Sequence, residues 1–190
     1  MIKFKVFGIQ FKVSFLFLCL ICWFFLNSKQ TVALIYFFSS LFHEIFHILA
    51  FLICSVKIDL ISFTVFGISI FKKQQIQFKK EFLILIFGCL GNLTLVLIFL
   101  ILNLKLVVFV NLFILIFNIL PFEKFDGGAI FKLILERFLN FKTAFKICKV
   151  VSNAVGLILF LFSALTVFYF KNKNILFAFF LFLLSPFFEF

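Results

Sequence analysis

The chain has 190 residues, of which 66% are hydrophobic and 39 are Phe, and its formal net charge is +11. Soluble domains are nearer half apolar, so this composition excludes a soluble globule and predicts one integral membrane domain spanning residues 1–190. The basic excess does not require a nucleic-acid partner, because membrane proteins concentrate Lys and Arg in their cytoplasmic loops.

Six apolar segments follow one another along the chain, at residues 13–26, 32–55, 82–103, 105–121, 147–170 and 174–188. Several match the roughly 20 residues that a helix needs to cross a bilayer. Lysines precede the first segment as in a signal peptide, but no small-residue cleavage site follows it, so we interpret it as an uncleaved span. The predicted fold class is a mainly α, polytopic membrane protein with about six transmembrane helices.

The basic residues predict the orientation of these spans. Six spans would place 14 of the 18 Lys and Arg residues on one side of the membrane and 4 on the other. Because Lys and Arg mark the cytoplasmic side, both termini and the two longer loops are predicted to be cytoplasmic. We expect a multi-pass protein of a bacterial cytoplasmic membrane.

Two stretches on the predicted cytoplasmic face have the period-two alternation of β-strands. Apolar residues alternate with polar ones over 2–13 and again over 58–70, where the pattern breaks at Phe66 and Gly67. We therefore predict a small cytoplasmic β-sheet, with a turn or bulge at that break. The alternative is an interfacial loop with an amphipathic bias.

The cysteines do not indicate a disulfide framework, because their number is odd and most lie within or at the ends of apolar segments. Cys19 and Cys22 have the C-x-x-C spacing of a redox or metal pair, but no second pair accompanies them. We interpret them as small apolar residues of a membrane helix.

The only two histidines lie in one motif, His43-Glu44-Ile45-Phe46-His47, near the middle of the second apolar segment. On a helix, residues four apart share a face, so both imidazoles can reach one tetrahedral Zn²⁺. Glu44 can then take a proton from the attacking water and pass it to the leaving amine. A charged group at mid-membrane is costly and is functional by default. The alternative is a polar network that only joins helices.

A catalytic zinc site requires a third protein ligand, and Asp126 is the best candidate. It follows the fourth apolar segment, after Pro121, and Gly127 and Gly128 come directly after it. The proline is expected to end the helix, and the glycines would let the backbone turn sharply so that the carboxylate folds back toward the metal. The second and fourth spans run in the same direction, so the three ligands can meet at one depth, with access from the cytoplasm.

These motifs resemble those of the site-2 protease family of intramembrane zinc metalloproteases. The family's marks are H-E-x-x-H in one transmembrane helix and N-x-x-P-x-x-x-x-D-G in a later one, and both occur here complete, the second from Asn118 to Gly127. The resemblance covers residues of about 30–130, the expected catalytic core, and includes a β-strand region after the first motif. It implies zinc ligands at His43, His47 and Asp126.

Two positions depart from the family's pattern. Phe46 occupies a position that is often Gly, and Gly88-Cys89-Leu90-Gly91-Asn92 has Cys where the family commonly has Pro. Asn92 and Asn118 are candidate substrate-binding residues, and for Asn92 an interhelical hydrogen bond is the alternative. Gly88 and Gly91 would favour close helix packing in either case.

The predicted function is cleavage of a membrane-tethered protein, within or near its transmembrane segment, by a zinc metalloendopeptidase. The substrate is expected to unwind and add as a strand along 60–70. The compact six-span plan resembles the subgroup containing a sporulation enzyme that processes a membrane-tethered pro-sigma factor, so release of a transcription factor is the expected outcome. The alternatives are a membrane metal carrier or zinc sensor, and a member that binds membrane proteins without cutting them.

Overall fold

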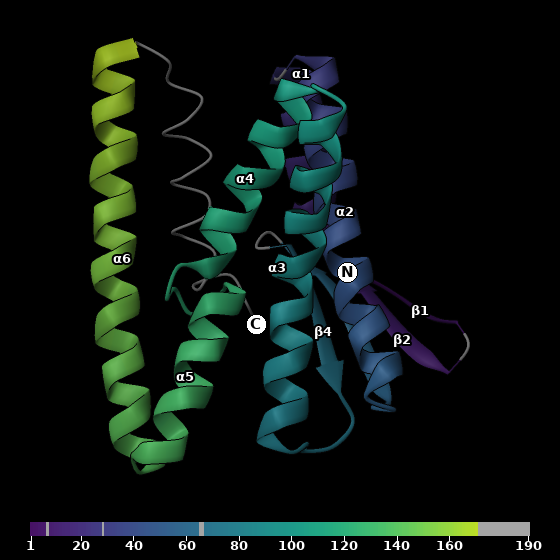
Figure 1. Ribbon diagram of the computed structural model, residues 1–190, viewed down its shortest axis with the longest axis vertical. Coiled ribbons are helices and arrows are strands. Elements are labelled where there is room, and N and C mark those ends of the chain that lie inside the picture. The colour runs from purple at the N-terminus through teal and green to yellow at the C-terminus, as the bar shows by residue number, and fades with distance from the viewer. Residues whose placement is uncertain (7, 28, 65–66, 171–190) are drawn as a thin grey trace.

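The computed structural model describes residues 1–6, 8–27, 29–64 and 67–170, and Figure 1 shows their arrangement. Ten elements lie in these ranges. In chain order they are β1 (Ile2–Val6), β2 (Ile9–Val13), α1 (Phe15–Asn27), α2 (Gln30–Ile53), β3 (Ile58–Thr64), β4 (Gly67–Lys72), α3 (Phe78–Ile101), α4 (Lys105–Ile119), α5 (Asp126–Phe138) and α6 (Phe141–Phe170).

The helices carry the hydrophobic segments. The described parts of α2, α3 and α6 are long and apolar enough to span a membrane, and α1 and α4 are shorter apolar helices. Most large apolar side chains on these helices are exposed, which is the expected surface of a protein solvated by lipid. The predicted mainly α membrane fold is confirmed. The predicted sixth span, 174–188, lies outside the described residues.

The two alternating stretches form one four-stranded sheet in the order β1-β2-β3-β4, which confirms the predicted β-sheet. β1 pairs with β2 and β3 pairs with β4 antiparallel, whereas β2 and β3 are parallel, with Phe11 opposite Ile61. A parallel pair needs a long crossover, and here α1 and α2 supply it. The predicted break falls between Thr64 and Gly67, where residues 65–66 lie outside the described ranges.

The strand order corrects one expectation. Substrate addition was predicted along 60–70, but β3 is hydrogen-bonded to β2 on one side and to β4 on the other. An added strand needs an unpaired edge. Within the described sheet, that edge at this end is β4, so only the second half of the predicted segment can receive a strand.

The region after α4 differs from the prediction of a loop. The chain leaves helix at Leu120 and Pro121 and re-enters it at Asp126, and α5 then continues in the same general direction as α4 (Figure 1). Pro121 and the Gly127-Gly128 pair suggested that the helix ends and the backbone turns sharply. The segment is instead amphipathic, its first turn holds an acidic residue where the helix dipole favours one, and Lys132 and Glu136 approach to 3.8 Å one turn apart.

A small hydrophobic core ties the sheet to the helices. Ala50 and Phe51 near the end of α2, and Val56 just after it, pack with Ile84 of α3, and partly buried side chains of β3 and β4 cover this cluster. α3 also packs along both α2 and α4, whereas α6 packs on α5. α3 and α4 therefore pack beside the middle of α2, where both histidines lie.

Candidate metal centre

Helix α2 presents both histidines on one buried face. His43 and His47 are one turn apart in a continuous helix, and their exposed fractions are only 4% and 7%. Their rings meet edge to face with centroids 4.8 Å apart. The helix therefore brings two imidazoles together in the interior of the protein, as the i, i+4 spacing predicts.

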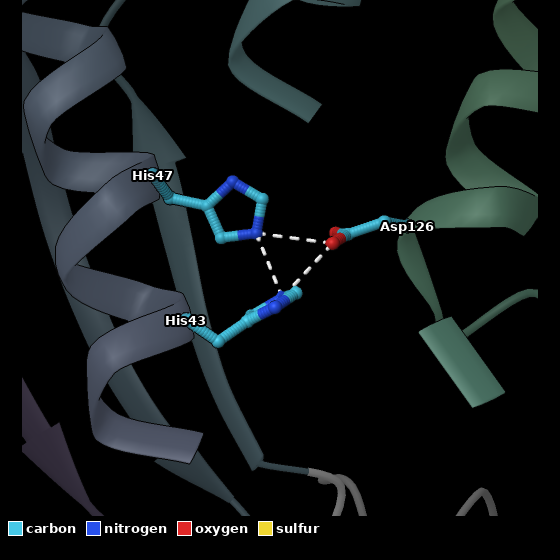
Figure 2. Close-up of side chains that lie close together, drawn as sticks. All are labelled: His43, His47 and Asp126. Atoms are coloured by element: carbon cyan, nitrogen blue, oxygen red, sulfur yellow. Dashed lines mark hydrogen bonds and ion pairs between the residues drawn. The ribbon is translucent and has the colours of Figure 1, made fainter. Parts of the chain in front are cut away.

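Asp126 reaches the histidines from the first turn of α5. Its Oδ2 lies 3.0 Å from His43 Nε2 and 3.1 Å from His47 Nε2, and the two Nε2 atoms are 3.1 Å apart (Figure 2). Residues separated by about 80 positions in the chain thus form one compact triangle of ligand atoms.

The outer nitrogen of each imidazole donates a hydrogen bond away from this triangle. His43 Nδ1–H donates to Asn92 Oδ1 at 2.6 Å, and His47 Nδ1–H donates to the Ile84 carbonyl at 2.8 Å. A neutral imidazole carries one proton, so both Nε2 lone pairs point at the triangle's centre. Two nitrogen lone pairs and a carboxylate oxygen at this separation repel one another unless a proton or a metal cation lies between them.

The donor set fits Zn²⁺. Zinc bonds to His nitrogen and carboxylate oxygen are about 2.0–2.1 Å, which separates the ligand atoms of a tetrahedral ion by about 3.3 Å. The observed sides of the triangle, 3.0–3.1 Å, come within a few tenths of an ångström of that value. Of the described residues, His43, His47 and Asp126 are a group that could hold a metal, and they would leave a fourth position open.

Glu44 lies beside this triangle on α2. Its side chain is half-buried, and its carboxylate interacts electrostatically with His43, His47 and Asp126. A carboxylate next to a metal's open position can accept a proton from water and return it to a leaving group. The general acid/base role predicted for Glu44 stays a prediction, with a position that suits it.

Close backbone approach explains the glycines around the site. A Cβ at Gly88 would lie 2.5 Å from His47 Cε1 and 2.7 Å from His43 Cε1, so only glycine leaves room for the imidazoles. A Cβ at Gly127 would lie 2.6 Å from the Leu120 carbonyl oxygen. The prediction that Gly127 and Gly128 form a sharp turn is wrong: both lie within α5 and neither has a positive φ. They instead let the start of α5 pack closely against the backbone of residues 119–123.

The two asparagines predicted to bind substrate lie in different environments. Asn92 is fully buried, and its amide is hydrogen-bonded to His43, Asn111 and Ser39. This geometry favours the alternative of an interhelical hydrogen bond that also orients His43. Asn118 is partly buried, and its Nδ2 donates to the Ile114 carbonyl of its own helix. Its predicted contact with substrate stays a prediction.

Ser39 and Asn111 were missed at the level of sequence. Ser39 is 4% exposed and Asn111 is fully buried, and Asn111 Nδ2 donates a hydrogen bond to Ser39 Oγ at 2.9 Å. Both are polar residues inside apolar segments, which was the available signal, because polar side chains in a membrane helix usually have a partner.

The comparisons with known proteins give a strong structural match. No protein-family model matches the sequence, and no curated protein matches it. Among solved structures, the chain is similar to the site-2 protease from Methanocaldococcus jannaschii, with a TM-score of 0.68 and 25% sequence identity. The match covers 94% of this chain and 92% of that one, so it extends over most of both chains.

Proposed function

We propose that this chain, which belongs to the site-2 protease family of intramembrane metalloproteases, uses Zn²⁺ to cleave a membrane-tethered protein within or near its transmembrane segment. The observation that carries the proposal is the triangle of His43, His47 and Asp126, with both imidazoles turned inward by their outer hydrogen bonds. When bound there, Zn²⁺ supplies a Lewis acid that polarises a carbonyl and lowers the pKa of water to about 7.

The protein's own residues supply the remaining steps. Glu44 accepts the proton of the attacking water and delivers it to the nitrogen of the leaving amine, so one carboxyl serves first as base and then as acid. The close contact of Gly88 on α3 with both imidazoles keeps the two rings in place during these transfers. Asn118, near the end of α4, is a candidate contact for the substrate.

The substrate must present an extended segment, because the amides of a helix are hidden in its own hydrogen bonds. The outer edge of β4, which pairs with no further strand among the described residues, supports this step, since an extended chain can add there through main-chain hydrogen bonds. Both termini, the sheet and access to the site are proposed to be cytoplasmic on a bacterial cytoplasmic membrane, from the distribution of Lys and Arg. Cleavage would then release a tethered factor into the cytoplasm, such as a transcription factor in sporulation or another pathway.

Glu44→Gln tests the chemistry. The variant should bind Zn²⁺ as the wild type does, while cleavage of a tethered substrate falls by at least the roughly 10²- to 10⁴-fold that general acid–base catalysis contributes. Substrates can be found by comparing membrane proteomes with active protein and with this variant, looking for a shortened tethered protein. Asp126→Ala is the companion variant and should lose both metal and cleavage. Undiminished cleavage by Glu44→Gln would remove Glu44 from the mechanism.

Cleavage of a substrate, rather than metal content, separates this function from that of a metal carrier. A carrier needs no acid/base residue between its histidines, and it would bind and release Zn²⁺ without cutting anything. Purified protein should hold about one equivalent of zinc, as expected of a single three-ligand site. Zinc binding with no substrate in any membrane proteome would favour the carrier.

A further inference from the structure

We infer that Asn111 is a positioning residue for the metal centre, acting through Asn92 to hold His43 with its Nε2 lone pair toward the metal. The inference rests on the proposed role of His43 as a ligand. Four side chains form the path, and all are buried: Ser39 and His43 on α2, Asn92 on α3 and Asn111 on α4.

The backbone carbonyl of Val107 determines how the first amide of this path, that of Asn111, is oriented. Asn111 Nδ2 donates to the Val107 carbonyl at 2.9 Å and to Ser39 Oγ at 2.9 Å. A carbonyl can only accept, so the nitrogen of this amide must face Val107. The Asn111 Oδ1 atom consequently faces Asn92 and offers it an acceptor.

The Asn111 amide in turn determines how the Asn92 amide is oriented. Its Nδ2 donates to Asn111 Oδ1 at 3.0 Å and to the Ser39 carbonyl at 3.4 Å. Turning the amide over would set its oxygen against two acceptors in a fully buried place, where unpaired polar groups are costly. Asn92 Oδ1 is therefore held toward His43, and it can only accept.

His43 must therefore donate the hydrogen bond that Asn92 Oδ1 accepts. The 2.6 Å contact places the imidazole proton on Nδ1, which leaves Nε2 unprotonated and aimed at the triangle. His47 reaches the same state by a shorter route, since its Nδ1–H donates directly to the backbone carbonyl of Ile84. Each ligand histidine is thus oriented by a backbone acceptor, and for His43 two asparagines carry the effect from Val107.

A simpler role, in which the amides only join α2, α3 and α4, makes a different prediction. Interhelical hydrogen bonds between asparagines stabilise membrane proteins without any effect on a ligand. Under that role, loss of Asn111 would lower stability but leave zinc affinity and the His43 imidazole unchanged. Under the proposed role, the metal centre itself responds.

The test uses full-length protein with its histidines labelled with ¹⁵N. Because the chain contains only two histidines, the zinc-loaded protein should give two Nδ1–H resonances. Asn92→Leu removes the acceptor of His43 and so identifies its resonance. Asn111→Leu should move that same resonance while leaving that of His47 in place, and should weaken zinc affinity by about tenfold, the lower end of the effect of removing a residue that supports a metal ligand.

Two further variants sharpen the result. Asn111→Asp keeps an oxygen toward Asn92 and, when protonated inside the membrane, can still donate to the Val107 carbonyl, so it should restore both the resonance and the affinity. Thr94→Val is the matched control, because the Thr94 hydroxyl is on α3 and donates to the Leu90 carbonyl of its own helix. It should change neither quantity.

Several outcomes would overturn the inference. They are an unchanged His43 resonance with wild-type zinc affinity in folded Asn111→Leu, and an equal shift of both histidine resonances. If Asn111→Leu does not fold, the wild-type protein decides: a His43 Nδ1–H that exchanges with water as freely as an exposed imidazole refutes the path. A wild-type protein that binds no zinc would instead refute the proposed function, which separates the two failures.

Discussion

Gly88→Ala is the sharpest perturbation of the metal centre that the structure offers. The added Cβ would lie 2.5 Å from His47 Cε1 and 2.7 Å from His43 Cε1, whereas ordinary contacts begin near 3.4 Å. The His43 and His47 rings would have to move by at least about 0.7 and 0.9 Å, respectively, to restore contact distance. A zinc site tolerates errors of about 0.2 Å in its ligand distances, so both ligands would leave their positions.

The size of the effect follows from overpacking. Extra methyl groups in a close-packed place cost about 1–3 kcal/mol. If that cost falls on the metal-bound state, zinc affinity drops by about 5- to 150-fold. The assay is competition for Zn²⁺ against a chelator of known affinity, with the protein in detergent. Thermal stability is the poorer readout, because Ala favours the helix over Gly by about 1 kcal/mol and masks part of the loss.

Gly91→Ala is the matched control in the same helix. Its Cβ would lie 2.7 Å from Phe46 Cγ, a clash of similar severity with a side chain that is not a ligand. The control should affect folding while leaving zinc affinity close to that of the wild type. Equal zinc affinity in Gly88→Ala and in the wild type would refute the claim that glycine is required to seat the imidazoles.

Three further predictions concern the same packing and the metal. Gly127→Ala should lower zinc affinity, because its Cβ meets backbone and displaces Asp126, whereas Gly156→Ala meets only the edge of the Phe122 ring at 3.3 Å and should bind zinc normally. Gly91→Ala combined with Phe46→Ala should destabilise the protein less than the two separate losses predict, with a coupling of about 0.5–3 kcal/mol in a double-mutant cycle of unfolding. Chelation should lower the thermal midpoint and added Zn²⁺ should restore it, and the free energy of unfolding should rise with free zinc as expected for a ligand of the native state, by about 2.7 kcal/mol at 100 times Kd.

Patterns that depend on local sequence were predictable. Apolar length predicts α2 and α3, and period-two alternation predicts strands at 2–13 and 58–70, because each pattern reports which environment surrounds a short segment. The i, i+4 spacing likewise requires His43 and His47 to share a face of α2. The structure then brings Asp126 to them, which the shared direction of the second and fourth spans had made possible.

Features that depend on contacts between distant segments were not predictable in this way. The position of β3 between β2 and β4 depends on a crossover through two helices, which alternation alone does not determine. A glycine beside an aspartate predicts a turn from local preference, whereas Gly127 is used for close packing against residues 119 and 120. The partner of Asn92 could be named only once α4 was placed beside α3.

The lipid environment explains why a few contacts between helices determine the geometry of the metal centre. Helices in a bilayer gain little from burying apolar surface against each other, so close approach at small residues and polar bonds carry the association. In this chain those contacts are Gly88 and Gly91 on α3, and the asparagine pair that joins α3 to α4. The departure at Phe46 fits the same principle. Phe46 occupies a position that is often glycine in the site-2 protease family, and Gly91 on the facing helix provides the space for its side chain. The space for this side chain is thus provided by the facing helix, so exchanges of large lipid-exposed residues should be tolerated while single added methyl groups at the α2–α3 contact should not.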